Sequence, residues 1–257
     1  MTAQRSSAAN LGSLAAEGKR LLRRGAYEAK SLVARYPALA LPIARRRHGV
    51  PVDERTRIVI EGFPRTGTSF AVAAFDLAQD GGVPIACHVH APAQILEGIR
   101  RGLPVVAVVR EPEDTVLSFM IRNPHLEAST SLRGYLRFYE PLRPHLGRIV
   151  VGTFPQVTAD MGAVIRRVNE RFGTGFASFE PTEDNVRRCF EAIEADYRKR
   201  LPEGEALERE VARPSAWRRE RKEELRAAYR SPSTARLRAR AERVFQAFAD
   251  AAGTGDP

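Results

Sequence analysis

Short apolar runs alternate with helical patterns over residues 57–180. Four runs predict strands, at 57–61, 84–89, 104–109 and 148–152, and the run at 104–109 is apolar throughout. Runs of this kind are typical of parallel strands that are covered on both faces. Helical patterns follow the runs, near residues 68–79, 93–101, from 111 onward and 161–171. This succession predicts an α/β fold, a three-layer sandwich with a central parallel sheet, P-loop-containing nucleotide hydrolase-like, with N- and C-terminal helical additions.

Two helical regions flank the alternating part. Residues 1–56 place leucines at roughly helical spacing among arginines and lysines, which predicts a basic amphipathic arm of one or two helices. We expect this arm either to pack on the main domain or to dock on a membrane surface or a partner. Residues 57–257 are the predicted main domain, with strands in 57–180, C-terminal helices at 184–200 and 218–249, and disorder after 251.

Composition and charge limit the classes of partner. The 257 residues are 43% hydrophobic, which is enough for one sizeable domain. The formal net charge is +10, but twelve basic and four acidic side chains fall within the first 57 residues, so the remainder is nearly balanced. A charge excess confined to one end is a weak indication of nucleic-acid binding. We therefore expect no nucleic-acid partner, although the charge favours some anionic ligand.

The cysteines and the lengths of the apolar runs indicate the redox state and the location that we expect for the protein. Cys87 and Cys189 lie far apart, and neither has the spacing of a zinc or iron–sulfur site, so no metal site is predicted. There is no run of about 18 apolar residues and no apolar N-terminal signal segment. The sequence predicts a reduced, cytoplasmic protein whose membrane contact, if any, is peripheral and through the arm. It leaves the oligomeric state open.

The segment 62–70, Gly-Phe-Pro-Arg-Thr-Gly-Thr-Ser-Phe, joins a predicted strand to a predicted helix. A glycine-bearing turn at such a junction directs backbone N–H groups and the helix dipole toward a phosphate. Gly62 and Gly67 have the spacing of the loop G-x-x-x-x-G-K-S/T, but Thr68 occupies the lysine position. Arg65, inside the loop, is the predicted replacement for that cation.

A second cation follows the strand predicted at 104–109. Nucleoside triphosphate enzymes of this architecture usually carry an acidic residue at the end of another strand to hold Mg²⁺. Here that strand is followed by Arg110, and Ser118 lies eight residues further on, within the next predicted helix. A cation at this place predicts a second anionic group on the ligand and no metal ion.

Three segments together resemble the sulfotransferases that use 3′-phosphoadenosine 5′-phosphosulfate (PAPS). Residues 64–70 resemble the family's 5′-phosphosulfate loop, 108–119 its 3′-phosphate motif, and 88–92 the segment that carries the catalytic base. The resemblance spans about residues 58–176. It implies transfer of a sulfuryl group from PAPS to a hydroxyl or amine, without a metal. It also implies that Arg65 and His90 are catalytic, and that the nucleotide is bound by Arg65, Thr66, Gly67, Thr68, Ser69, Phe70, Arg110 and Ser118.

The sequence departs from the family pattern in its C-terminal part. The motif R-K-G-x-x-G-D-W, which closes over the nucleotide, is missing, and residues 213–218 are the candidate substitute. Some relatives use a glutamate as the base, so the assignment of His90 has an alternative, and His88 is predicted to be structural. Residues 124–139 are expected to line the acceptor pocket. The acceptor itself cannot be identified from the sequence.

Two other functions stay open at this stage. One is a kinase that uses a nucleoside triphosphate and a degenerate phosphate loop, whose activity would require Mg²⁺ and stop in EDTA. The other is a non-catalytic basic scaffold, attached by residues 1–57 to a membrane or nucleic acid. Its binding would depend steeply on salt and would be lost with the arm.

Overall fold

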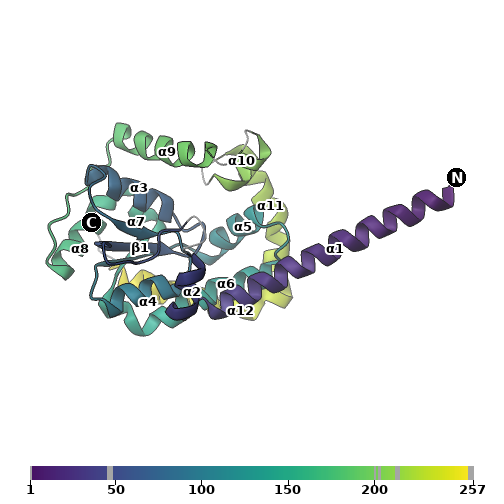
Figure 1. Ribbon diagram of the computed structural model, residues 1–257, viewed down its shortest axis with the longest axis horizontal. Helices are drawn as coiled ribbons and strands as arrows, with labels where there is room; N and C mark the ends of the chain where they lie inside the picture. Colours follow the sequence, from purple (N-terminus) through teal and green to yellow (C-terminus); the bar gives the residue numbers. More distant parts are fainter. Residues whose placement is uncertain (1, 45–48, 200, 202–203, 212–214, 254–257) are drawn as a thin grey trace.

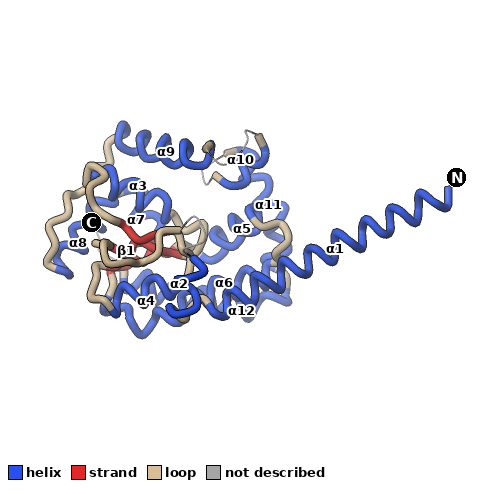
Figure 2. Tube along the Cα trace, viewed as in Figure 1, coloured by secondary structure: helices blue, strands red, loops and turns tan. Residues whose placement is uncertain are grey.

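A computed structural model describes residues 2–44, 49–199, 201, 204–211 and 215–253 of the chain. Its centre is a four-stranded parallel sheet of β1 (Ile58–Gly62), β2 (Ile85–Cys87), β3 (Val105–Val109) and β4 (Val150–Thr153), in the order β2-β1-β3-β4. Figure 2 shows these strands in red between two layers of helices. The predicted fold class, an α/β fold with a central parallel sheet, is confirmed, and so are the four strands.

Side chains of successive strand residues point to opposite faces of the sheet, and each face has its own apolar core. On one face, Val59, Val105 and Ala107 pack against the helices α4 (Pro92–Arg100), α5 (Pro112–Arg122), α6 (Ala128–Tyr139) and α12 (Ala235–Ala251). On the other, Ile60 and Val108 pack against α3 (Thr68–Ala78), α8 (Met161–Phe172) and α9 (Glu183–Arg198). In Figure 1, α4, α6 and α12 lie below the sheet, and α3 and α9 lie above it.

Three parts of the C-terminal half differ from the sequence prediction. The helix α6 and the short helix α7 (Phe154–Ala159) were not predicted. The single helix predicted over 218–249 is two helices, α11 (Ala216–Arg230) and α12, separated by the turn η2 (Pro232–Thr234). Pro232 explains the break, because a residue before proline is driven to extended backbone, and Ser231 has ψ 143. Two further elements are η1 (Glu140–Arg148) and α10 (Glu205–Glu210).

The N-terminal arm consists of α1 (Thr2–Val33) and α2 (Pro37–Ala44). The C-terminal end of α1 packs on α5 and α6: the ring of Tyr27 lies 5.7 Å from that of Phe119 in α5, and Glu28 forms ion pairs with Arg133 and Arg137 of α6. The N-terminal part of α1 extends away from the domain (Figure 1). None of the described helices is both long enough and apolar enough to cross a membrane.

Candidate functional site

The segments predicted to bind the ligand leave the sheet at one edge, around the end of β1. The registers pair Gly62 of β1 with Val108 of β3, and Ile60 with Cys87 of β2. The chain runs from β1 to β2 in one direction and then crosses to β3 on the other side of β1. Such a reversal of strand order opens a crevice at the carboxyl ends of the strands, where α/β proteins bind ligands.

The loop between β1 and α3 is folded tightly against the end of its own strand. A Cβ atom on Gly62 would lie 2.6 Å from the carbonyl oxygen of Val108 and 2.6 Å from Oγ1 of Thr66. Arg65 has φ 78 and Gly67 has φ 96, so the chain turns through the left-handed region twice. Gly67 gives α3 no side-chain cap, and the first N–H groups of this helix therefore remain available to an anion.

The side chains of residues 66–70 differ in their burial and in their contacts. Thr66 is fully buried, and its hydroxyl donates to the carbonyl oxygen of Phe63 at 2.8 Å and lies 3.3 Å from that of Thr68. Ser69 is half-buried. The ring of Phe70 belongs to the apolar core, with its centroid 6.4 Å from that of Phe179. Contacts from Thr66 and Phe70 to a phosphate would thus come from the backbone.

Tyr139 of α6 fixes the loop to the neighbouring strand. Its hydroxyl donates to the carbonyl oxygen of Val108 at 2.7 Å and accepts from the N–H of Phe63 at 3.2 Å. Tyr139 is fully buried, and burial raises the pKa of its hydroxyl, which therefore stays protonated and able to donate. The unpredicted helix α6 thus holds the loop between β1 and α3 in place.

Arg65 is a nearly buried cation with an unused donor. Its Nε donates to Oγ of Ser118 at 3.0 Å, and its Nη1 donates to the carbonyl oxygen of Glu210 at 2.6 Å. Its Nη2 is buried and has no hydrogen-bond partner among the residues that the structure describes, and the residue is 8% exposed. A buried donor without an acceptor is costly, and an anion placed beside it would remove that cost.

A second buried arginine shares the same serine. Arg218 of α11 donates from Nη2 to Oγ of Ser118 at 2.9 Å and from Nη1 to the carbonyl oxygen of Glu208 at 2.9 Å. Burial, together with repulsion from Arg218, lowers the pKa of the Arg65 guanidinium, and burial also lowers that of Arg218. Two cations held this close by one neutral hydroxyl form a positive site that a bound anion would stabilise.

Arg110 lies at the end of β3, as predicted. Its guanidinium donates to Asp114 at 2.7 Å and lies over the ring of Phe154, 3.9 Å from the centroid. Lys222 of α11 contacts the other oxygen of Asp114 at 2.9 Å. Burial lowers the pKa of the Lys222 ammonium group. Asp114 thus pairs with both Arg110 and Lys222, so these three side chains together carry an excess of positive charge.

His90 lies on the other side of β1 and is held by a buried carboxylate. Its Nδ1 is 2.9 Å from the carbonyl oxygen of Gly62 and 3.3 Å from Oε1 of Glu61. Both of these atoms accept hydrogen bonds, so Nδ1 carries the proton and Nε2 carries the lone pair. Glu61 is fully buried, and its Oε2 accepts from the N–H groups of Val89 and His90 at 2.8 and 3.1 Å.

Several residues of this arrangement were missed in the sequence. Glu61 interrupts an apolar strand immediately before the loop, and an acidic residue in such a run was a usable signal. Lys222 gave no signal, because it lies within a charged helix. Of the candidate segment 213–218, residues 213 and 214 lie outside the described part of the chain, while Arg218 reaches Ser118. The ring of His88 lies 5.8 Å from that of His90.

Two further observations concern metals and the acceptor. Among the described residues, no three His, Cys, Asp or Glu side chains are grouped so that they could hold a metal ion. A cavity of about 550 Å³ is lined by residues of the predicted acceptor segment, Pro124 and Leu126 among them. The cavity is also lined by Arg209, Trp217 and Arg221, which lie near Arg218 in the chain, whereas Arg65, Arg110 and Ser118 are not among its lining residues.

The chain has little detectable similarity to known proteins. No family model matches the chain, and no curated protein matches it. Among solved structures, the crystal structure of the mouse sulfotransferase SULT7A1 complexed with PAP is similar, with 10% sequence identity and a TM-score of 0.39. The match covers 78% of this chain and 93% of that chain. What this chain binds must therefore be inferred from its own residues.

Proposed function

We propose that this protein transfers a sulfuryl group from PAPS to a hydroxyl or amine of an acceptor. The observation that carries the proposal is the buried, unpartnered Nη2 of Arg65, placed in a loop whose helix has an uncapped N-terminus. Both the unpaired donor and the uncapped helix N-terminus would stabilise an anion bound at this place. The motif resemblance of residues 64–70 and 108–119 identifies that anion as the phosphosulfate of PAPS.

The nucleotide would be held at two ends. The N–H groups at the start of α3, with Arg65, would bind the 5′-phosphosulfate, and Ser118, Arg110 and Arg218 would surround the 3′-phosphate. The planar guanidinium groups suit bidentate contact with phosphate oxygens. Ser118 is the link between the two ends, because its hydroxyl contacts Arg65 and Arg218.

The reaction is an in-line displacement at sulfur. The acceptor oxygen or nitrogen attacks the sulfur atom while its proton passes to Nε2 of His90. The bond between sulfur and the oxygen that bridges to the 5′-phosphate breaks, and adenosine 3′,5′-bisphosphate leaves with the negative charge. Arg65 stabilises that charge as it develops, and the sulfated acceptor is the second product.

Ligand-dependent stabilisation tests the donor. A saturating concentration of adenosine 3′,5′-bisphosphate, about 100 times its dissociation constant, adds about 2.7 kcal/mol to the free energy of unfolding. For a chain of this length, that corresponds to a rise of roughly 5–10 °C in Tm, measured by differential scanning fluorimetry. We expect this rise with the bisphosphate, with or without EDTA. A rise with ATP and Mg²⁺ but not with the bisphosphate would favour the kinase instead.

Replacing Arg110 by alanine should mainly weaken nucleotide affinity. Charged hydrogen bonds to a phosphate contribute about 1.5–3 kcal/mol, so the dissociation constant of the bisphosphate should rise roughly 10- to 100-fold. Asp114 would keep Lys222 as a partner, and the fold should therefore be retained. Isothermal titration calorimetry measures the change. An unaltered dissociation constant would remove Arg110 from the nucleotide site.

A further inference from the structure

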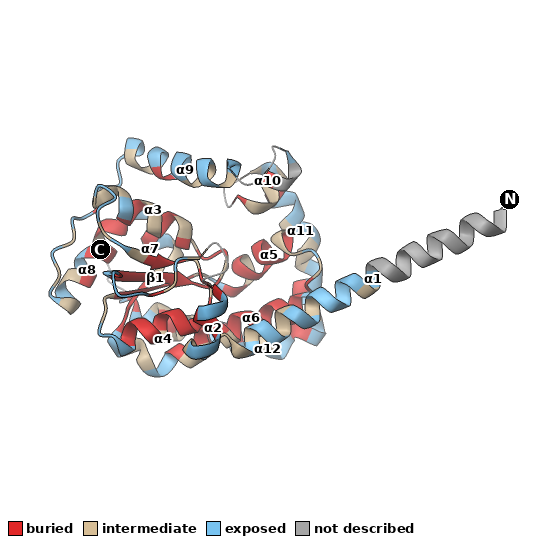
Figure 3. Ribbon diagram, viewed as in Figure 1, coloured by how far each residue is buried: buried red, intermediate tan, exposed pale blue. Residues whose placement is uncertain are grey.

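The arm has an apolar face that the domain leaves uncovered. In α1, Arg24, Tyr27 and Glu28 face α5, α6 and the loop between them. On the remaining surface of the helix, Leu22 is 75% exposed and Leu21 and Leu32 are 61% and 56% exposed. Gly25, Ala26 and Ala29, which are also exposed, lie between them. Figure 3 shows the exposed turns of α1 in pale blue.

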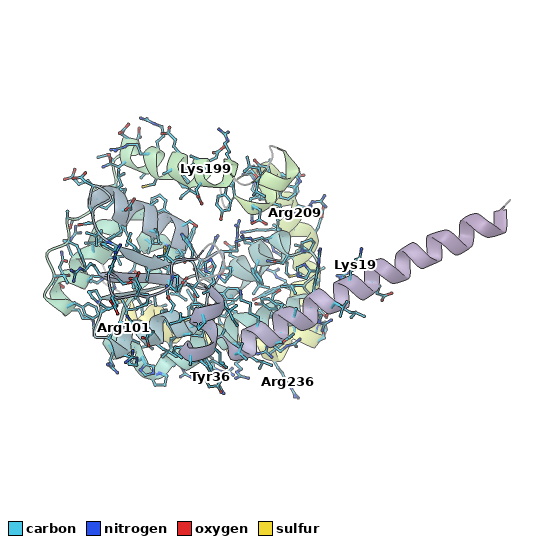
Figure 4. The ribbon with its side chains drawn as sticks, in the orientation of Figure 1. Lys19, Tyr36, Arg101, Lys199, Arg209 and Arg236 are labelled. Atoms are coloured by element: carbon cyan, nitrogen blue, oxygen red, sulfur yellow. The ribbon has the colours of Figure 1, made fainter. Side chains whose placement is uncertain are left out.

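The apolar surface continues through the turn into α2. This helix has the sequence PALALPIA, without a charged residue. Its buried residues Ala40 and Leu41 pack with Val89 and Ala93 of the domain, whereas Leu39 and Ile43 are 53% and 47% exposed. Tyr36, at the junction of the two helices in Figure 4, is 45% exposed. We call Leu21, Leu22, Leu32, Tyr36, Leu39 and Ile43 the outer face of the arm.

Basic side chains border the outer face. At 100° per residue, Lys19, Arg23 and Lys30 fall along one edge of α1, next to the exposed leucines. Lys19 extends from the projecting part of the helix in Figure 4. Within residues 17–44 the acidic residues are Glu17 and Glu28, and Glu28 is held by Arg133 and Arg137. The border is therefore positive, which favours a negatively charged partner.

We propose that the outer face of the arm binds the surface of a membrane that contains anionic phospholipids. Exposed leucines beside a row of cations fit the boundary between headgroups and acyl chains, and a tyrosine at the edge suits the same boundary. A second copy of the chain would bring an equally positive border against the first. Charge complementarity thus selects an anionic lipid surface over self-association.

Vesicle co-sedimentation of the full-length protein tests this proposal. We expect at least about tenfold stronger partitioning onto vesicles of phosphatidylcholine with phosphatidylserine than onto phosphatidylcholine alone, and loss of the difference in 0.5 M NaCl. Leu22→Glu/Leu32→Glu should reduce partitioning about tenfold or more. The matched control, Ala192→Glu/Ala195→Glu, adds the same charge to exposed positions of α9 and should bind as the parent protein does.

A change in vesicle binding can be distinguished from failure of the proposed function and from misfolding of a variant. The four substituted positions are exposed, so each variant should keep the bisphosphate-induced rise in Tm. Equal sedimentation with neutral and anionic vesicles, or unchanged binding of the leucine variant, would overturn the proposal. So would an arm-dependent dimer in analytical ultracentrifugation combined with no vesicle binding, because the second copy would then cover the outer face.

Discussion

Replacing Arg65 by alanine is expected to lower kcat/KM for PAPS roughly 10²- to 10³-fold, the usual cost of losing one group that stabilises developing charge. The structure supports a large effect because Arg65 is nearly buried and, in the described part of the chain, no residue accepts a hydrogen bond from its Nη2. A charge interaction in such a place is poorly screened by water. Steady-state kinetics with a sulfatable acceptor, followed by release of the bisphosphate, measure the loss.

Two variants separate this effect from damage to the fold. Arg65→Lys keeps a cation in the loop, and lysine is the commoner residue in the family that the loop resembles, so it should retain activity within about tenfold of the parent. Arg240→Ala removes an exposed arginine that pairs with Glu140 and should change kcat/KM by less than about twofold. Full activity in Arg65→Ala would show that the leaving group is stabilised elsewhere.

Replacing His90 by alanine should lower kcat by roughly 10²- to 10⁴-fold, the range for loss of a general base. Only the neutral imidazole accepts a proton, so the activity of the parent protein should fall as the solution becomes more acidic. The variant should lose this acidic limb and retain affinity for the bisphosphate. A pH–rate profile of kcat tests both statements. Full activity at every pH would place the base on another residue.

Glu61→Gln tests whether the carboxylate positions this base. Glutamine keeps an oxygen for the N–H groups of Val89 and His90 but removes the negative charge beside Nδ1. If Glu61 holds the imidazole in the reactive orientation, kcat should fall about tenfold or more while the dissociation constant of the bisphosphate stays unchanged. A merely structural role would alter Tm and leave kcat unchanged.

The local pattern was sufficient for the sheet and for the loop. The strands at Ile58–Gly62 and Val105–Val109 were predictable because strands buried on both faces are mainly apolar, Val105–Val109 throughout and Ile58–Gly62 up to Glu61. The positions of Arg65 and Arg110 followed from these strands, since Arg110 lies immediately after β3 and Arg65 lies three residues after the end of β1. The helix α6 was missed because its buried serine, threonine and glycine dilute the apolar period.

The sequence by itself determined the parallel sheet, the glycine-bearing loop that follows β1 and the basic character of the arm, because each depends on residues close together in the chain. Only the tertiary structure decided which groups meet. The hydrogen bonds of Ser118 to Arg65 and Arg218 join residues 53 and 100 positions apart, and Glu61 reaches His90 across 29. Such contacts depend on how the helices pack on the sheet, and no periodicity within one segment carries that information.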